Sequence, residues 1–307
     1  MKKKLNQLTT SLLVLATLFV ATACEDVIDL NTETGPSQLV VDGWITNQPG
    51  TQTIRLAQSA AYFNNQPARP VVQAEVTVTD DQGNTYVFKD ERNQGVYQWV
   101  PKNEAVALGQ IGRNYTLRIV HEGETYVASN SIRRVPTIDS LVYEEENFPF
   151  TPPEGPREGY VAEFFARDFS GIGDTYWIKP LRGGKLFRNE PSQISIAFDG
   201  AFSPGVASDG LVFIWPLRQS ITANRLLSVG DTVGVELHSI TPETYYFLLQ
   251  VRQESSNGGI FAVPPANIPT NIRNLNPAGK QALGYFGASA VSKAETIIDP
   301  AKARPKS

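Results

Sequence analysis

The feature that most constrains the fold is a series of short segments in which apolar and polar residues alternate. Residues 51–57 and 74–79 show the pattern clearly, and it is typical of a strand with one buried face. About seven such segments occur within residues 36–135, with turn-forming residues about every ten positions. This spacing predicts an immunoglobulin-like β-sandwich over residues 36–135.

A tyrosine near the end of that region fits the same prediction. Tyr115 closes the sequence Gly112-Arg-Asn-Tyr and stands at the start of a strand-like segment. This arrangement resembles a tyrosine corner, in which the phenol hydroxyl bonds back to nearby backbone. The chain has one Cys, so the disulfide of antibody domains is excluded.

Residues 136–298 predict a second, β-rich domain with one helix. Thr241 suits the N-cap and Pro242 the first helical position, so we expect the helix at about 242–256. The polar, mostly basic residues 299–307 predict a disordered tail. The expected fold class is therefore all-β, with two domains. Further strand-like segments are 160–166, 175–179, 211–215 and 233–239.

The N-terminus has the pattern of a signal peptide over residues 1–23. Lys2 to Lys4 precede an apolar run and the small residues 21–23, and Cys24 follows. The apolar run is about a dozen residues, too short to cross a bilayer as a helix. The pattern resembles a lipobox, with Ala21 where leucine is usual, and predicts lipidation of Cys24. An ordinary secretory signal with an incidental cysteine is the alternative.

Residues 24–35 are expected to form an acidic linker after the lipidated cysteine. Glu25, Asp26 and Asp29 resemble the surface-export signal of Bacteroidota lipoproteins. The alternative is a solvated linker without that role. The expected location is the outer membrane, lipid-anchored, at the cell surface or on the periplasmic face.

Cleavage after residue 23 would make the chain more acidic. It removes three of the 27 basic residues and none of the 31 acidic ones, which leaves 24 basic residues and a net charge of −7. An acidic surface argues against nucleic acid as a partner. It also argues against electrostatic binding to anionic lipid, so attachment to the membrane would depend on the acyl chains.

Several motifs occur in an order that resembles one family over nearly the whole mature chain: Leu39–Trp44, Ala74–Asp80, Tyr115–Ile119, Pro136–Leu141 and Ala282–Ser289. The family is the uncharacterised Bacteroidota lipoprotein family catalogued as domain of unknown function 4249. The resemblance implies an outer-membrane or cell-surface lipoprotein, often encoded beside TonB-dependent receptors, and hence an accessory role. The family has no established activity, so no catalytic residue is carried over.

One loop could hold a metal ion. Asp168, Ser170 and Asp174 place oxygen donors in a glycine-rich segment, and calcium takes six to eight oxygen ligands. The loop lacks the closing Glu of an EF-hand, and a plain strand–strand turn is the alternative interpretation. We expect no cofactor.

Tryptophans are the other candidates for a binding site. Trp177 and Trp215 lie in strand-like segments, where they could pack in the core or form an aromatic surface for a sugar ring or a partner. Trp177 and residues 189–210, a polar, glycine-rich segment expected to be an ordered insert, are the first places to look for such a surface.

These observations predict a binding protein, not an enzyme. The leading hypothesis is an accessory or binding partner of a TonB-dependent receptor or other outer-membrane complex. The alternative is a stand-alone carbohydrate- or peptide-binding surface lipoprotein. A carboxylate-based hydrolase is the third hypothesis, and it would need clustered carboxylates in a cleft. Residues 144–146 are three glutamates, but neighbouring strand residues face opposite ways, so the run is not a catalytic pair in itself and a solvated strand end is the alternative.

Overall fold

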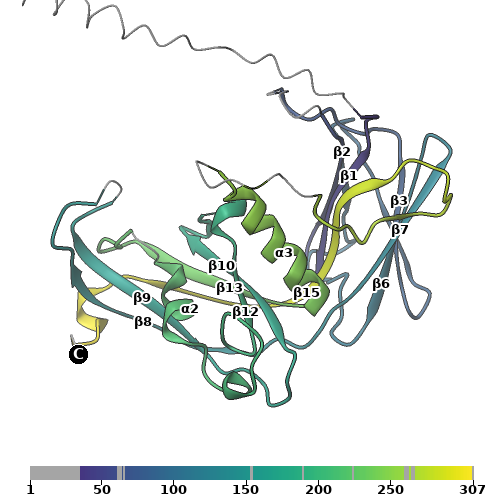
Figure 1. Ribbon diagram of the computed structural model, residues 1–307. Coiled ribbons are helices and arrows are strands. Elements are labelled where there is room, and N and C mark those ends of the chain that lie inside the picture. Colours follow the sequence, from purple (N-terminus) through teal and green to yellow (C-terminus); the bar gives the residue numbers. More distant parts are fainter. Residues whose placement is uncertain are drawn as a thin grey trace, which may run out of the picture. The chain divides into compact units, whose positions relative to one another are not determined.

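The computed structural model describes most of the chain after residue 34 (Figure 1). The predicted signal peptide, Cys24 and the linker as far as Thr34 lie outside the described residues. Ser37–Ser307 form one compact unit. The described residues are 35–60, 64, 66–152, 155–188, 190–222, 225–258, 263 and 267–305.

An eight-stranded sheet is the largest element. Its order is β11-β10-β13-β15-β1-β2-β5, and β12 pairs with β10 beside this path. Neighbours are antiparallel except β1 and β15, which run parallel. The strands are β1 (Leu39–Thr46), β2 (Gln52–Gln58), β5 (Val96–Trp99), β10 (Thr175–Arg182), β11 (Lys185–Leu186), β12 (Ser195–Phe198), β13 (Thr232–Ile240) and β15 (Ala282–Ile297).

A five-stranded sheet of order β14-β7-β6-β3-β4 packs against one end of the large sheet. Val41 and Ile54 of the large sheet share a core with Leu117 and Ile119 of the smaller one. Their strands bury every second side chain, as the alternation predicts. The strands of this sheet are β3 (Glu75–Asp80), β4 (Thr85–Phe88), β6 (Asn114–His121), β7 (Glu124–Ser131) and β14 (Arg273–Asn274).

The first seven strands have an immunoglobulin-like distribution. The first, second and fifth lie in one sheet, and the third, sixth and seventh lie in the other, with β4 beside β3. The all-β fold class with an N-terminal sandwich is therefore confirmed.

The second half of the chain extends both sheets of this sandwich. Residues 282–289 of β15 pair with β1, residues 290–297 pair with β13, and β14 pairs with β7. The border expected near residue 136 therefore lies inside one compact unit. Local alternation identifies strands but not their partners, so it cannot reveal that two halves share a sheet.

A third, two-stranded sheet closes the second core. Strands β8 (Ile138–Asn147) and β9 (Glu158–Ala166) pair antiparallel. Phe164 of β9 packs with Tyr176 and Leu237 of the large sheet. Short helices complete this half: α2 (Trp215–Arg218), η1 (Pro191–Gln193), η2 (Val206–Ser208), η3 (Gln219–Ile221) and η5 (Pro300–Lys302).

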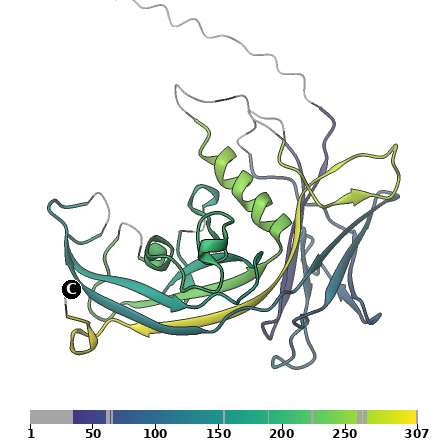
Figure 2. The same cartoon turned by 60° about the horizontal axis from the view of Figure 1, so that its bottom comes forward.

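Helix α3 (Pro242–Ser255) is the helix expected at about 242–256. The Thr241 hydroxyl accepts a hydrogen bond from the Thr244 backbone N–H at 3.3 Å, and Pro242 occupies the first turn. Tyr245 and Leu248 are buried against β12 and the end of β13. Figure 2 shows α3 on the concave side of the curved sheet. Among the described residues, no helix is both long and apolar enough to cross a membrane.

The C-terminal tail differs from the expectation of disorder over 299–307. Residues 299–305 are described, and the Tyr143 hydroxyl donates a hydrogen bond to the Asp299 carbonyl at 3.1 Å. The Arg304 backbone N–H donates to the Tyr143 carbonyl at 2.8 Å. The polar composition did not reveal these bonds, because they depend on the backbone reaching β8.

The tyrosine corner is confirmed. The side chain of Tyr115 is fully buried, and its hydroxyl accepts a hydrogen bond from the Gln110 backbone N–H at 2.7 Å. The same hydroxyl donates to the Leu108 carbonyl at 3.5 Å. These bonds fix the segment that leads into β6.

We expect Tyr115→Phe to lower the free energy of unfolding by about 1 kcal/mol, because the ring still fits while two backbone groups lose their partner. Urea denaturation measures this change. Tyr246→Phe, at a tyrosine of α3 that is 48% exposed, is the matched control and should be neutral. Equal stability of the two variants would contradict the role of the corner.

Candidate ligand-binding pocket

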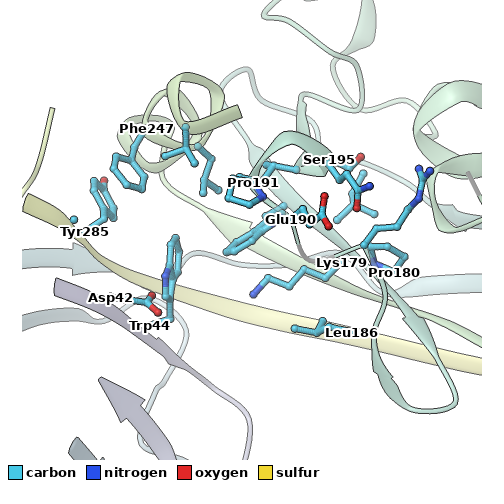
Figure 3. A pocket seen from close by; sticks show the side chains of 18 of the residues that line it. Asp42, Trp44, Lys179, Pro180, Leu186, Glu190, Pro191, Ser195, Phe247 and Tyr285 are labelled. Atoms are coloured by element: carbon cyan, nitrogen blue, oxygen red, sulfur yellow. The ribbon is translucent and has the colours of Figure 1, made fainter. Parts of the chain in front are cut away.

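A cavity of about 580 Å³ lies between strands β1, β10 and β15, helix α3 and residues 190–195 (Figure 3). Its size falls within the range usual for small-molecule sites. Its walls are mainly apolar and aromatic, with a few charged and polar groups: Asp42, Lys179, Arg188, Glu190, Gln193 and Ser195. We call it the aromatic pocket.

Four aromatic side chains form a continuous row in this pocket. The Trp177 and Trp44 rings meet edge to face, with centroids 5.0 Å apart. Trp44 lies 6.2 Å from Tyr285, and Tyr285 stacks on Phe247 at 4.3 Å. The row thus joins β10, β1, β15 and α3, and it offers ring faces and edges to a ligand.

Strand periodicity and one glycine put these rings in place. Trp44 follows Asp42 by two positions on β1, so both side chains lie on one face of the sheet. Gly287 is the residue of β15 that pairs with Trp44. A Cβ atom on Gly287 would lie 2.1 Å from Cζ3 of Trp44, so the indole occupies the space that any other residue would fill.

Lys179 supplies a positive charge beside the rings. Its Nζ lies 3.7 Å from the centroid of Trp177 and 5.9 Å from that of Trp44, and Figure 3 shows the amine pointing toward Trp44. Burial lowers the pKa of Lys179 to about 8, opposed by the charges of Glu236 and Asp42. The amine is therefore mostly protonated at neutral pH.

The N–H groups of the Lys179 ammonium have no hydrogen-bond acceptor among the residues that the structure describes. Among the described residues, no carboxylate lies within ion-pair distance of it and no hydrogen bond engages it. Its contacts are the cation–π contacts with Trp44 and Trp177. An anionic or oxygen-rich ligand could therefore bind here without displacing a protein partner.

His238, the residue of β13 that pairs with Trp177, contacts two polar side chains. The His238 Nδ1 lies 2.9 Å from the Ser289 hydroxyl, and its Nε2 lies 3.4 Å from Glu236 Oε2. Burial lowers the pKa of His238 to about 4, with a contribution from the nearby charge of Lys179. His238 is thus neutral at physiological pH and serves to link β13 and β15.

Residues 190–195 form one wall of the pocket. Arg252 of α3 donates a hydrogen bond from Nη1 to the Ile194 carbonyl at 3.1 Å. Pro191 and Ile194 face the cavity beside Leu248 and Val251 of α3. The helix therefore holds this wall against the aromatic row.

The tryptophans predicted as candidates lie in different places. Trp177 lines the aromatic pocket, and part of the polar insert, within residues 190–195, lines it as well. Trp215 is 56% exposed on α2 and lines a separate cavity of about 340 Å³. Sequence reasoning missed Lys179, although its spacing of two from Trp177 places both on one strand face. Nothing in the sequence indicated that Phe247 and Tyr285 line a binding pocket.

The three predicted metal ligands, Asp168, Ser170 and Asp174, have different surroundings in the structure. The Asp174 carboxylate pairs with Arg133 at 3.5 Å and with Arg134 at 3.1 Å. Asp168 is buried and accepts a hydrogen bond from the Tyr176 hydroxyl at 2.5 Å. Ser170 is exposed beside Gly210. None of the three lines the aromatic pocket.

A second group of carboxylates lies in an open cavity of about 500 Å³, lined by Glu145, Glu146 and Glu158. Glu145 accepts a hydrogen bond from the Tyr160 hydroxyl at 3.3 Å, and Glu158 accepts one from the Asn147 amide at 3.1 Å. Glu145 and Glu158 are exposed to solvent. The structure thus places three glutamates of β8 and β9 around one open cavity.

The fold and the pocket together define an all-β protein with a sandwich core and a cavity suited to a small ligand. The chain belongs to the family described as Domain of unknown function (DUF4249), whose sequence profile matches residues 25–295. The match spans both halves of the large sheet. No curated protein and no solved structure matches the chain.

We expect Lys179→Met to raise the free energy of unfolding near neutral pH by about 1 kcal/mol, because it removes a partly buried charge. The gain should shrink as the pH rises. Above about pH 8 the folded chain releases the Lys179 proton, whereas the unfolded chain keeps it up to about 10.5. Wild-type stability therefore rises through this window.

Urea denaturation at about pH 7 and about pH 9.5 measures this change. Lys185→Met on β11, where the side chain is exposed, is the control and should show no such pH dependence. A stability difference between wild type and Lys179→Met that stays constant across the two pH values would refute a buried, titrating amine.

Proposed function

We propose that this protein is a non-enzymatic, lipid-anchored binding protein of the Bacteroidota outer membrane that holds part of a glycan in the aromatic pocket. The observation that carries the proposal is the row of four rings that ends beside the Lys179 ammonium group, which has no ion-pair partner in the described part of the chain. Such a row offers stacking surface beside a positive charge, which suits binding.

The charge of Lys179 narrows the ligand class. A sugar ring can lay its apolar face on Trp44 or Trp177, and a carboxylate on that sugar would reach the ammonium group. An acidic sugar, such as a uronic acid, therefore fits better than a neutral one. A peptide carboxylate beside an apolar side chain is the alternative with the same chemistry.

The sequence supports the cellular setting. Lipidation at Cys24 would tether the folded unit to the outer membrane, at the cell surface or on its periplasmic face. Tethering raises the effective concentration of the pocket near a TonB-dependent receptor or other outer-membrane complex. The protein would then act as an accessory that captures ligand for that complex.

Isothermal titration calorimetry of the lipoprotein with uronic-acid and neutral oligosaccharides tests the pocket. We expect Trp177→Ala to weaken binding of the acidic oligosaccharide about tenfold, through lost stacking. Lys179→Met should remove the preference for the acidic over the neutral sugar, and raising the pH past about 8 should do the same to wild type.

Trp215→Ala, in the neighbouring cavity, and the exposed-site variant Lys185→Met are the controls, and both should bind as wild type does. Absence of binding across the panel, or equal loss in the controls, would overturn the assignment of a glycan. Binding of peptides alone would favour the peptide alternative.

We expect Cys24→Ser to move the protein from the membrane fraction to the soluble fraction, because no acyl chain can be attached. Fractionation followed by intact-mass measurement tests this. Wild type should carry the added mass of the acyl chains, and the variant should not. Continued membrane association of the variant would contradict anchoring through Cys24.

Purification of the wild-type lipoprotein from native membranes separates the accessory from the stand-alone form of the proposal. Recovery of a stoichiometric outer-membrane barrel supports the accessory role. Recovery of the lipoprotein alone, under conditions that preserve known complexes, supports a stand-alone glycan-binding protein.

A further inference from the structure

Three carboxylates from separate segments meet away from the aromatic pocket. Asp168 follows β9, Asp199 follows β12 and Asp209 follows η2. Each offers an oxygen that lies within 4.8 Å of the others. We call them the aspartate cluster.

A left-handed backbone conformation and two backbone hydrogen bonds position Asp199 in this cluster. Asp199 has a φ of 47°, a left-handed conformation in which side chains other than glycine are uncommon. Its Oδ1 accepts hydrogen bonds from the backbone N–H groups of Gly173 and Asp174 at 2.7 and 2.9 Å. The loop that starts at Asp168 is thereby fastened to the turn at Asp199.

One oxygen of the cluster is buried without a partner. Asp199 is fully buried, and its Oδ2 has no hydrogen-bond partner among the described residues. Because two N–H groups already occupy Oδ1, Oδ2 is the oxygen of this residue that can bind a ligand. A buried carboxylate oxygen left unpaired is costly, so its presence points to a missing positive ligand.

The cluster also lacks a counter-charge from the protein. Among the described residues, no Lys, Arg or His nitrogen lies within ion-pair distance of the three carboxylates. The nearby Arg133 and Arg134 pair with Asp174 instead. Burial raises the pKa of Asp168, and the charges of Asp174 and Asp199 add to this rise, as expected for like charges held together.

We propose that Asp168, Asp199 and Asp209 bind one divalent cation, and that calcium is the ion they fit. The donors are all carboxylate oxygens, which calcium prefers, and the site has neither the nitrogen nor the sulfur ligands typical of zinc. The exposed hydroxyl of Ser170, beside Gly210, and water can complete the ligand set. The ion would neutralise the cluster and join three loops.

A bound ion would also stiffen the insert that reaches the aromatic pocket. Residues 190–195 line that pocket and lead through β12 to Asp199. Beyond Asp199, the Phe202 carbonyl accepts a hydrogen bond from the Tyr245 hydroxyl of α3 at 2.6 Å. The cation site itself does not depend on what the pocket binds.

Equilibrium dialysis of the full lipoprotein with calcium tests the proposal, without any sugar present. We expect about one ion per chain, with a dissociation constant of about 10⁻⁵ to 10⁻³ M. Calcium should raise the midpoint of thermal unfolding relative to protein in a chelator. Terbium in place of calcium should luminesce when tyrosine is excited, because the Tyr176 hydroxyl contacts Asp168.

Asp199→Asn and Asp209→Asn should each weaken calcium binding at least about tenfold, because each removes a ligand charge. Asp209 is only partly buried, so its variant should fold even if Asp199→Asn does not. Asp139→Asn, on an exposed position of β8, is the control and should bind as wild type does.

Two results would overturn the proposal. One is a wild-type protein that shows neither saturable calcium binding nor a calcium-dependent unfolding midpoint, as expected if the carboxylates share a proton. The other is an Asp209→Asn variant that binds calcium as tightly as wild type.

Discussion

The pairing of one long strand with two distant partners underlies the whole structure. Strand β15 runs for 16 residues; its first half pairs parallel with β1 and its second half antiparallel with β13. The residues from Tyr285 to Ala290 are all buried, because cores form on both faces of the sheet there. Without β15, the sandwich and the second half of the chain would each expose a long strand edge, which natural proteins avoid.

The aromatic pocket follows from that sheet. Trp44 comes from the sandwich and Trp177 from the second half of the chain. Strands β15 and β13 join these two halves in one sheet, and the two rings come into contact across that sheet. Gly287 then leaves room for the indole above β15. The site is therefore a property of the joined unit, which agrees with a family match that spans both halves.

Two sites in this fold hold buried or partly buried charge that lowers the stability of the folded chain. Among the residues that the structure describes, no carboxylate pairs with the partly buried Lys179, and no basic side chain pairs with the aspartate cluster. Burial of unpaired charge destabilises a folded chain, and perturbed groups of this kind concentrate at functional sites. Lys179 is positive and the aspartate cluster is negative. A ligand that neutralises Lys179 would therefore be an anion, and a ligand that neutralises the aspartate cluster would be a cation. Residues 190–210 of the polar insert run from the aromatic pocket to the aspartate cluster.

The sequence alone determined the local structure: alternation predicted an all-β chain, Thr241 and Pro242 predicted the start of α3, and Gly112 to Tyr115 predicted the tyrosine corner. Each of these signals involves residues close together in the chain. Only the tertiary structure decided that Leu39 pairs with Ala282, that Lys179 lies against two indoles, and that Asp168 meets Asp199 and Asp209 in place of Asp174. Strand pairing and side-chain clustering across such separations depend on how the whole core packs, and a local pattern of apolar and polar residues does not record it.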